Sequence, residues 1–367
     1  MSVTKKSAIR QLLNTHLVAV TKMVRVDVVG SGAWGTTLTA LIASKGSDVR
    51  LVCRRQELAD EIRRRGENSA HLPGVKLPRQ IEISSLAENP FYDSTHVVLA
   101  ITSQHMREML EQPPFRCLGE AFVLNATKGL EYKQKGNYSG KRMSQVISES
   151  LKLNIQYPVS VLSGPNLASE IAAGQYAATV IACEDAAIAQ GWRNIFKVPG
   201  RFAPDVSDDV AGVELGGALK NIVAIACGMV DGLGLGDNTK AAVIAHGLVD
   251  LVAIGECYGA RRETFYGISG IADINATCYS NRSRNRLVGE RVAQGKALDV
   301  VLYELSAEMR GEPEGPETVR VIYALNGGLA LPTVKAVHGV LYAHADPRQS
   351  IMSILESPLR QPEQRFK

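Results

Sequence analysis

The sequence has little that could form a metal centre or a disulfide framework. Its six cysteines are scattered among 367 residues, and no two stand at the CxxC spacing of zinc and redox sites. The seven histidines provide no HxxxH pair that one face of a helix could present to a metal. Isolated cysteines within apolar stretches are typical of core residues in a reducing compartment. We therefore predict a cytoplasmic protein without a metal.

Net charge, aromatic side chains and long apolar runs are also scarce. The formal net charge is only +4 and aromatic residues make up 5% of the chain, which disfavours a nucleic-acid-binding surface. The best apolar run, Ile222 to Val230, is far shorter than the roughly 18 residues that span a bilayer. A hydrophobic content of 45% excludes collagen-like and broadly disordered classes. We expect no nucleic-acid partner and no membrane span.

The two ends of the chain differ from the rest. Residues 1–22 carry four basic residues and no acidic one. This pattern leaves three interpretations: an organellar transit peptide, a basic N-terminal extension, or a stretch that precedes a start at Met23. Residues 359–367 are predicted to be a tail, and they lack the SKL-type peroxisomal address.

A dinucleotide-binding pattern begins directly after this extension. The β-branched run 24–29 is typical of a buried parallel strand, and it is followed at once by the letters GSGAWG, a helical apolar pattern and a second strand at 49–53. In this context Gly30 is expected to make the tight turn, Gly32 to let the backbone approach a pyrophosphate, and Gly35 to allow helix–strand packing. The helix N-terminus then offers amide donors to the anion.

The remaining pattern predicts two domains. Short apolar runs predict further strands at 96–101, 121–127, 159–162 and 179–183. After about residue 205 the strand signal fades and helical spacing takes over. We predict an α/β fold in which a Rossmann-like doubly wound sheet, residues 23–205, precedes an all-helical substrate and catalytic domain, residues 206–358.

Two arginines bear on the choice of cofactor. Arg54 and Arg55 follow the second strand, where an NAD-preferring fold places an acid that binds the ribose hydroxyls. A guanidinium suits a 2′-phosphate instead, because it binds phosphate with two hydrogen bonds. The alternative is that both are solvated surface charges. We favour NADP(H) and leave NAD(H) open.

Two lysines stand at positions that favour chemistry. Lys128 directly follows the strand 121–127, and the carboxyl ends of such strands hold the ligand. Lys220 lies in an otherwise apolar helix, expected to run from a cap at 207–209 through Gly228. A lysine there either extends to the surface or points into a cleft with a lowered pKa, and the sequence leaves both open. We interpret the glycine-rich turn 231–238 as a helix connector.

A basic helix start is predicted near residue 283. Ser283 can cap a helix whose first turn carries Arg284 and Arg286. Basic residues oppose the helix dipole at this end unless an anion binds, which favours a phosphate site. The alternative is an exposed basic helix start without a ligand.

With these motifs in view, the chain closely resembles the soluble NAD(P)-dependent glycerol-3-phosphate dehydrogenases. The resemblance runs from about Val24 to Leu355 and rests on several long motifs in the family's order. They are GSGAWGT, LPG at 72–74, ATKGLE at 126–131, SGPNLASEI at 163–171, GALKNIVAIACGMVDGLGLGDNTKAA at 217–242, TCYSNRSRNR at 277–286 and EGPET at 314–318.

The resemblance implies reversible reduction of dihydroxyacetone phosphate to sn-glycerol 3-phosphate with NAD(P)H, which feeds glycerophospholipid synthesis. It implies that Lys220 is the acid/base on the C2 oxygen, with Lys128 and Asp273 beside it. The implied substrate contacts are Lys128, Gly164, Asn166, Asn221, Asp273, Thr277, Ser283, Arg284 and Asn285. The cofactor contacts, from the family or the local pattern, are Gly30, Gly32, Ala33, Trp34, Gly35, Arg54, Arg55, Lys128, Ala168, Arg284 and Glu314.

The chain departs from the usual family pattern at two places, GIADI at 270–274 and ITS at 101–103. These departures keep open a paralogous reductase of a related phosphorylated or phosphonate ketone. A reductase of another hydroxy compound, indifferent to phosphate, and a catalytically silent dinucleotide sensor are further alternatives. Apolar helices in the second half favour a homodimer, although they also fit a core.

Overall fold

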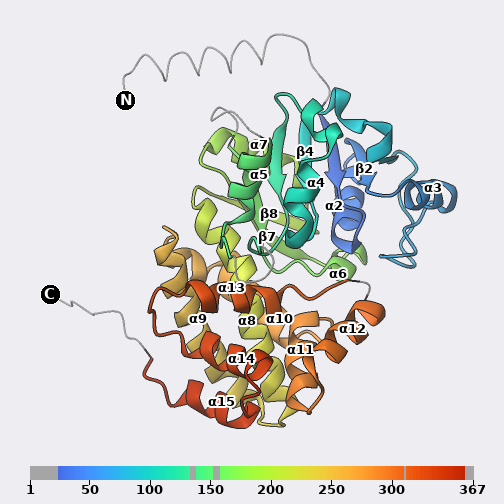
Figure 1. Cartoon of the computed structure of the whole chain (residues 1–367). Coiled ribbons are helices and arrows are strands. Elements are labelled where there is room, and N and C mark those ends of the chain that lie inside the picture. Colours follow the sequence, from blue (N-terminus) through green and yellow to red (C-terminus); the bar gives the residue numbers. More distant parts are fainter. Residues whose placement is uncertain (1–23, 133–137, 152–157, 310, 360–367) are drawn as a thin grey trace, which may run out of the picture.

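The computed structural model describes residues 24–132, 138–151, 158–309 and 311–359. The predicted basic extension 1–22 and all but the first residue of the predicted tail lie outside the described residues. Figure 1 shows two parts, one that holds all the labelled strands and one built from α8 to α15. The predicted order, a dinucleotide-type sheet followed by helices, is confirmed.

Eight strands form one sheet in the order β3-β2-β1-β4-β5-β6-β7-β8. All neighbours run parallel except β6 and β7, which are antiparallel. The strands are β1 (Arg25–Val29), β2 (Asp48–Cys53), β3 (Glu82–Ser85), β4 (His96–Leu99), β5 (Phe122–Asn125), β6 (Ser160–Ser163), β7 (Ala177–Ala182) and β8 (Phe202–Ser207).

The sequence prediction missed the two edge strands, β3 and β8, and the antiparallel step. Strand β3 reads EISS and β8 reads FAPDVS. Edge strands need not be continuously apolar, and they tolerate a proline that a central strand would exclude. The strand signal therefore fades before the sheet ends.

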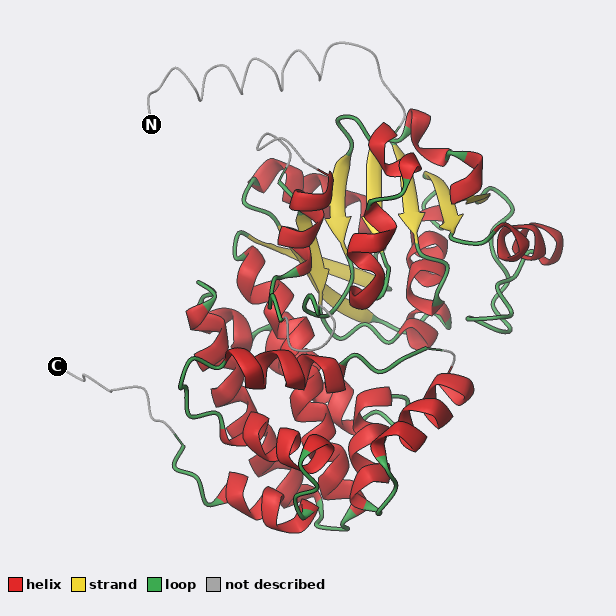
Figure 2. Ribbon diagram, viewed as in Figure 1, coloured by secondary structure: helices red, strands yellow, loops and turns green. Residues whose placement is uncertain are grey.

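Helices cover both faces of the sheet, as Figure 2 shows. Successive strand residues belong to different cores: Val98 packs in the cluster of α2 and α7, whereas Val97 and Leu99 pack in the cluster of α4 and α5. This alternation is what two buried faces require. The helices are α2 (Ala33–Ala43), α3 (Gln56–Arg65), α4 (Met106–Leu110), α5 (Met143–Leu151), α6 (Ala168–Ala172) and α7 (Ala186–Phe196).

The second part is helical and surrounds α8. Its helices are α8 (Val210–Gly232), α9 (Asp237–Cys257), α10 (Asp273–Tyr279), α11 (Arg284–Ala293), α12 (Leu298–Met309), α13 (Gly315–Leu325), α14 (Pro332–Tyr342) and α15 (Pro347–Leu355). Every residue of α8 from Gly212 to Val230 is buried. By length and composition α8 could cross a membrane, but its apolar stretch is entirely buried inside this domain.

Glycine lets α8 and α11 pack backbone to backbone. A Cβ on Gly228 would lie 1.8 Å from the carbonyl oxygen of Arg286, and a Cβ on Gly289 would lie 1.9 Å from that of Ile225. Asp209 caps α8 by accepting from the amide of Gly212, as predicted, although the helix continues past the predicted end at Gly228. The small residues thus fix the helix that carries Lys220.

Candidate functional site

The side chains of Lys128 and Lys220 converge on one carboxylate. Lys128 Nζ donates to Asp273 Oδ2 at 2.7 Å, and Lys220 Nζ donates to Asp273 Oδ1. Lys128 also donates to the carbonyl oxygen of Gly164 at 2.7 Å, and Lys220 donates to Thr277 Oγ1 at 2.7 Å. Sequence segments far apart therefore meet at a single point between the two domains.

Each lysine reaches this point for a reason that lies in its own element. Lys128 follows β5 at the carboxyl edge of the sheet, and its aliphatic stem runs past Gly217 of α8, where a Cβ would lie 3.4 Å from its Cγ. Lys220 lies nearly one turn beyond Gly217 on the same helix. Gly216 lets α8 approach the segment before α10, because a Cβ there would lie 2.3 Å from the carbonyl oxygen of Ser269.

The electrostatics of the pair suit proton transfer. Burial lowers the pKa of Lys220 to about 8, and the Lys128 ammonium adds to this fall while the Asp273 carboxylate opposes it. One carboxylate faces two ammonium groups, so the cluster keeps a net positive charge. The structure thereby decides the question that the sequence left open: Lys220 is buried and does not extend to the surface.

Asn221 and Thr277 complete the buried polar surroundings of Lys220. The hydroxyl of Thr277 donates to the backbone oxygen of Asp273 at 2.7 Å, so a lone pair of the hydroxyl oxygen is left to accept from Lys220. Asn221 is buried beside Lys220. No hydrogen bond joins its amide to another side chain among the described residues.

A buried acidic group lies near the loop that carries Lys128. Glu314, at the start of α13, accepts from the backbone amide of Ser103 at 3.2 Å and from its hydroxyl at 3.1 Å. It also lies against Gly129, where a Cβ would be 2.3 Å from Glu314 Oε2. Burial raises the pKa of Glu314 to about 7, and the Ser103 hydrogen bonds and the charge of Arg284 oppose the rise.

Arg284 is held near this carboxyl group without an ion pair to any residue of the described ranges. Burial lowers its pKa, while Glu314 and Glu312 oppose that change. Arg286, two residues on, behaves differently: it donates to Asp231 at 2.6 Å and to Glu290 at 3.0 Å. The expectation from the local pattern that both arginines face a phosphate is thus corrected for Arg286. Its partner Asp231 was predicted to lie in the connector 231–238, but it belongs to the last turn of α8 and has a structural role.

The remaining predicted substrate residues make hydrogen bonds within the protein. The hydroxyl of Ser283 accepts from the amide of Arg286 at 3.2 Å and caps α11, as expected. The side chain of Asn166 donates to Ala178 on β7 and accepts from Thr179. Asn285 accepts from the amide of Gly315 at 2.9 Å. Their contacts with substrate stay predictions.

The glycine turn fits the pyrophosphate of a dinucleotide. Gly30 has a φ of 112°, and a Cβ there would lie 2.3 Å from the carbonyl oxygen of Ala100. A Cβ on Gly35 would lie 1.8 Å from the Gly30 oxygen, so this glycine packs the helix onto the strand. Gly32 caps α2 with no side chain over its amides, and the space where a Cβ would stand is open. Such amides are ready donors for an anion.

Other predicted cofactor residues surround this turn. Trp34 Nε1 donates to the carbonyl oxygen of Ala126 at 3.1 Å, which fixes its ring beside the loop that carries Lys128. The carbonyl oxygen of Ala168 accepts from the hydroxyl of Thr37 at 3.2 Å, so α6 lies against α2. Arg54 and Arg55 are exposed after β2. Neither arginine forms an ion pair within the part of the chain that the structure describes.

The comparisons with known proteins identify the family. Residues 25–189 match the model of the NAD-dependent glycerol-3-phosphate dehydrogenase N-terminus, and residues 209–352 match that of the C-terminus. The chain belongs to this dehydrogenase family. Among the described residues, no group of three or more histidine, cysteine or acidic side chains could hold a metal ion. The family supports a nicotinamide dinucleotide as the cofactor.

Individual relatives agree with this assignment. Glycerol-3-phosphate dehydrogenase [NAD(P)+] of Corynebacterium glutamicum is 39% identical over 335 residues, which are 91% of this chain and 98% of the relative. The structure of the Coxiella burnetii glycerol-3-phosphate dehydrogenase aligns with a TM-score of 0.82 at 28% identity, over 92% of this chain and all of that one. A D-mandelate dehydrogenase aligns with a TM-score of 0.54 at 10% identity, which shows a shared fold alone.

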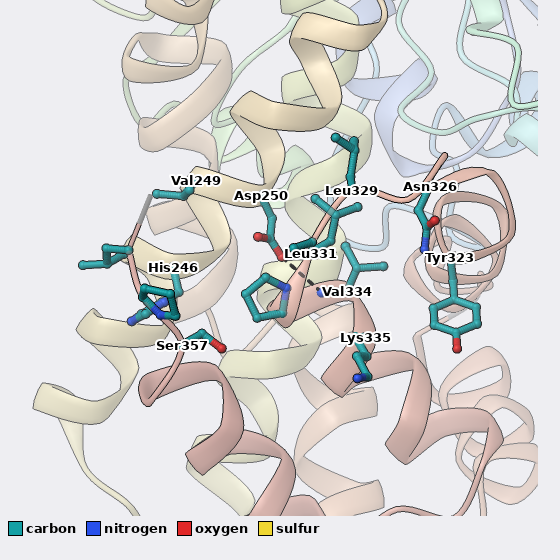
Figure 3. Close-up of a pocket in the computed structure, with 14 residues that line it drawn as sticks. His246, Val249, Asp250, Tyr323, Asn326, Leu329, Leu331, Val334, Lys335 and Ser357 are labelled. Atoms are coloured by element: carbon teal, nitrogen blue, oxygen red, sulfur yellow. Dashed lines mark hydrogen bonds between the residues drawn. The ribbon is translucent and has the colours of Figure 1, made fainter. Parts of the chain in front are cut away.

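Sequence reasoning missed three side chains that support the dehydrogenase site. Ser103 binds Glu314, while Asn125 and Glu214 lie behind the loop of Lys128. The one sequence signal for a role of Glu214 is that it is an acidic residue within the apolar stretch of α8. A separate hollow of about 470 Å³ in the helical domain (Figure 3) is lined by His246, Lys335 and other residues, none of which the sequence predicted as part of the site.

Proposed function

We propose that this protein interconverts dihydroxyacetone phosphate and sn-glycerol 3-phosphate by hydride transfer with a nicotinamide dinucleotide, a reaction that feeds glycerophospholipid synthesis. The observation that carries the proposal is the pair of lysines on the carboxylate of Asp273, at the junction of the two family domains. Reduction of a ketone places negative charge on its oxygen, which needs a proton donor and nearby cations.

The residues of the cluster suit separate tasks. A bound dinucleotide supplies the hydride and accepts it in the reverse direction. Lys220 donates a proton to the C2 oxygen during reduction and removes that proton during oxidation. Asp273 holds both ammonium groups at fixed positions, and the Lys128 cation stabilises the charge that develops on oxygen. A pKa of about 8 lets Lys220 serve in both directions near neutral pH.

The phosphate of the substrate is assigned to the start of α11. Arg284 carries a charge that no carboxylate among the described residues neutralises by an ion pair, and it stands in the first turn of the helix, where the dipole favours an anion. Binding energy from the phosphate then positions the reacting carbonyl. Phosphate at this place also explains why a basic first turn is tolerated.

The decisive experiment follows NADH and NADPH oxidation with dihydroxyacetone phosphate and with unphosphorylated dihydroxyacetone. We expect rapid oxidation that depends on the phosphate. Equal rates with both ketones would favour a reductase that ignores phosphate. Tight cofactor binding without turnover of either ketone would favour a dinucleotide sensor and would overturn the proposal.

NADP(H) preference is a finer proposal, and it rests on Arg54 and Arg55. We expect Arg54→Asp to raise the KM for NADPH more than the KM for NADH, because a guanidinium pairs with a 2′-phosphate that NADH lacks. Steady-state kinetics with each cofactor test this. Arg79→Asp is the matched control. Arg79 is also an exposed arginine, but it does not lie in the segment after β2 that is expected to bind the ribose. Equal effects of Arg54→Asp on both cofactors would contradict the assignment.

Two further expectations stay predictions. A homodimer would show in light scattering of the purified protein as twice the mass of the 39.6 kDa chain. A cytoplasmic location is tested by fractionation of cells that express the full chain, including residues 1–22.

A further inference from the structure

Glu214 is a buried charge that the proposed reaction does not use. Its side chain is fully buried on α8, and four donors surround it. Oε1 accepts from the amide of Ser144 at 2.8 Å and from Asn125 Nδ2 at 3.1 Å. Oε2 accepts from the Ser144 hydroxyl at 2.6 Å and from Arg142 Nη1 at 3.0 Å. A buried carboxylate held this way has one fixed orientation.

Asn125 transmits this orientation to the loop after β5. Its Nδ2 donates to the backbone oxygen of Thr127 at 3.3 Å as well as to Glu214, so both amide hydrogens are used. Its Oδ1 accepts from the amide of Thr127 at 3.0 Å. The hydroxyl of Thr127 donates to the carbonyl oxygen of Ile101 at 2.5 Å, which ties the same residue to the end of β4. The backbone that leads into Lys128 is thus held from two sides.

The same helix therefore controls both lysines. Lys220 projects from α8 directly, while Lys128 is connected to α8 through Glu214 and Asn125. Gly217, nearly one turn beyond Glu214, leaves room for the stem of Lys128. We propose that Glu214, acting through Asn125, is a positioning residue that fixes Lys128 on the carboxylate it shares with Lys220. The inference rests on the proposed function in one respect, namely that the two lysines act on a substrate.

The test compares Asn125→Ala with Ser144→Ala. Each variant removes a hydrogen bond to Glu214, but only the first releases Thr127 and the loop of Lys128. We expect both variants to lower the Tm, and only Asn125→Ala to lower kcat, by about 10- to 10²-fold, as small displacements of catalytic groups do. Ser144→Ala should keep the kcat of the wild type.

The pH profile separates positioning from a general loss of stability. Two charged groups face Lys220: Asp273 from α10 and Lys128 from the loop after β5. Withdrawal of Lys128 removes the repulsion between the two ammonium groups. It also leaves Lys220 as the one lysine that pairs with Asp273. Both changes raise the pKa of Lys220. The alkaline limb of the reduction profile should move to higher pH in Asn125→Ala and stay in place in Ser144→Ala. Identical kcat values and profiles for the two variants would overturn the proposal.

Crystal structures of the two variants give a readout that does not need turnover. The contact of Lys128 Nζ with Asp273 Oδ2 should be lost in Asn125→Ala and kept in Ser144→Ala, and its retention in both would overturn the inference. If the wild type fails to reduce dihydroxyacetone phosphate, the proposed function fails and these structures still decide the positioning role. Should Asn125→Ala not fold, Asn125→Asp carries the test. The aspartate still accepts from the amide of Thr127 but has no amide hydrogens to donate to Glu214, so a fall in kcat is expected and wild-type kcat would contradict the proposal.

Discussion

Replacement of Lys220 by alanine is expected to lower kcat for dihydroxyacetone phosphate reduction by about 10²- to 10⁴-fold, the usual contribution of a positioned proton donor. The affinity for NADPH should stay close to that of the wild type, because the glycine turn of the cofactor site lies on another domain. Steady-state kinetics and fluorescence titration with NADPH measure the two quantities.

The control for this variant is Lys240→Ala. Lys240 is also a buried lysine of the helical domain, and it pairs with Asp231 at 2.5 Å. If the two variants show the same decrease in kcat and the same decrease in Tm, the effect comes from the removal of a buried charge pair. If Lys220→Ala retains most of its activity, Lys220 is not the acid/base.

The pH dependence of the wild type should have opposite signs in the two directions. A lysine with a pKa of about 8 loses its proton as the pH rises through 8. Reduction needs the protonated form, so kcat/KM for the ketone should fall above pH 8. Oxidation of glycerol 3-phosphate needs the neutral form, so its kcat/KM should rise over the same range. Profiles that move in the same direction would exclude Lys220 as the titrating group.

Replacement of Arg284 by alanine is expected to lower kcat/KM for dihydroxyacetone phosphate by about 30- to 5 × 10³-fold, because loss of one partner of a buried ion pair costs about 2–5 kcal/mol. The slow rate with unphosphorylated dihydroxyacetone should not change, since that ketone has no phosphate to lose. The ratio of the two kcat/KM values measures phosphate recognition directly.

Arg291→Ala is the matched control on the same helix. Arg291 pairs with Glu304 and Glu308 near the other end of α11. Its loss should leave the ratio between the two ketones unchanged. If Arg284→Ala also leaves this ratio unchanged, the phosphate binds elsewhere and the reductase that ignores phosphate becomes the better interpretation.

Local features were predictable from the sequence because short-range geometry determines them. The turn at Gly30 needs a positive φ, and the caps of α8 and α11 need a side-chain oxygen three residues before an amide. Each requirement is met within a few residues, so a single sequence reveals it. The central strands were predictable for a related reason, since both of their faces are buried and they read as continuous apolar runs.

Edge strands and buried charge partners depended on contacts between distant segments. Strands β3 and β8 carry polar residues and a proline, which only their place at the edges permits. The local charge pattern treated Arg284 and Arg286 alike, and only the family resemblance singled out Arg284. Arg286 forms an ion pair with Asp231, which is 55 residues away in the chain.

The sequence by itself determined the dinucleotide turn, the order of the two domains and the residue types of the site. Only the tertiary structure decided that Lys220 is buried, that it shares Asp273 with Lys128, and that Glu214 lies behind both. Lys220 and Asp273 are 53 residues apart, and Lys128 and Asp273 are 145 apart. The pKa of Lys220 depends on burial and on these two neighbours, and both arise only when the helical domain packs against the sheet.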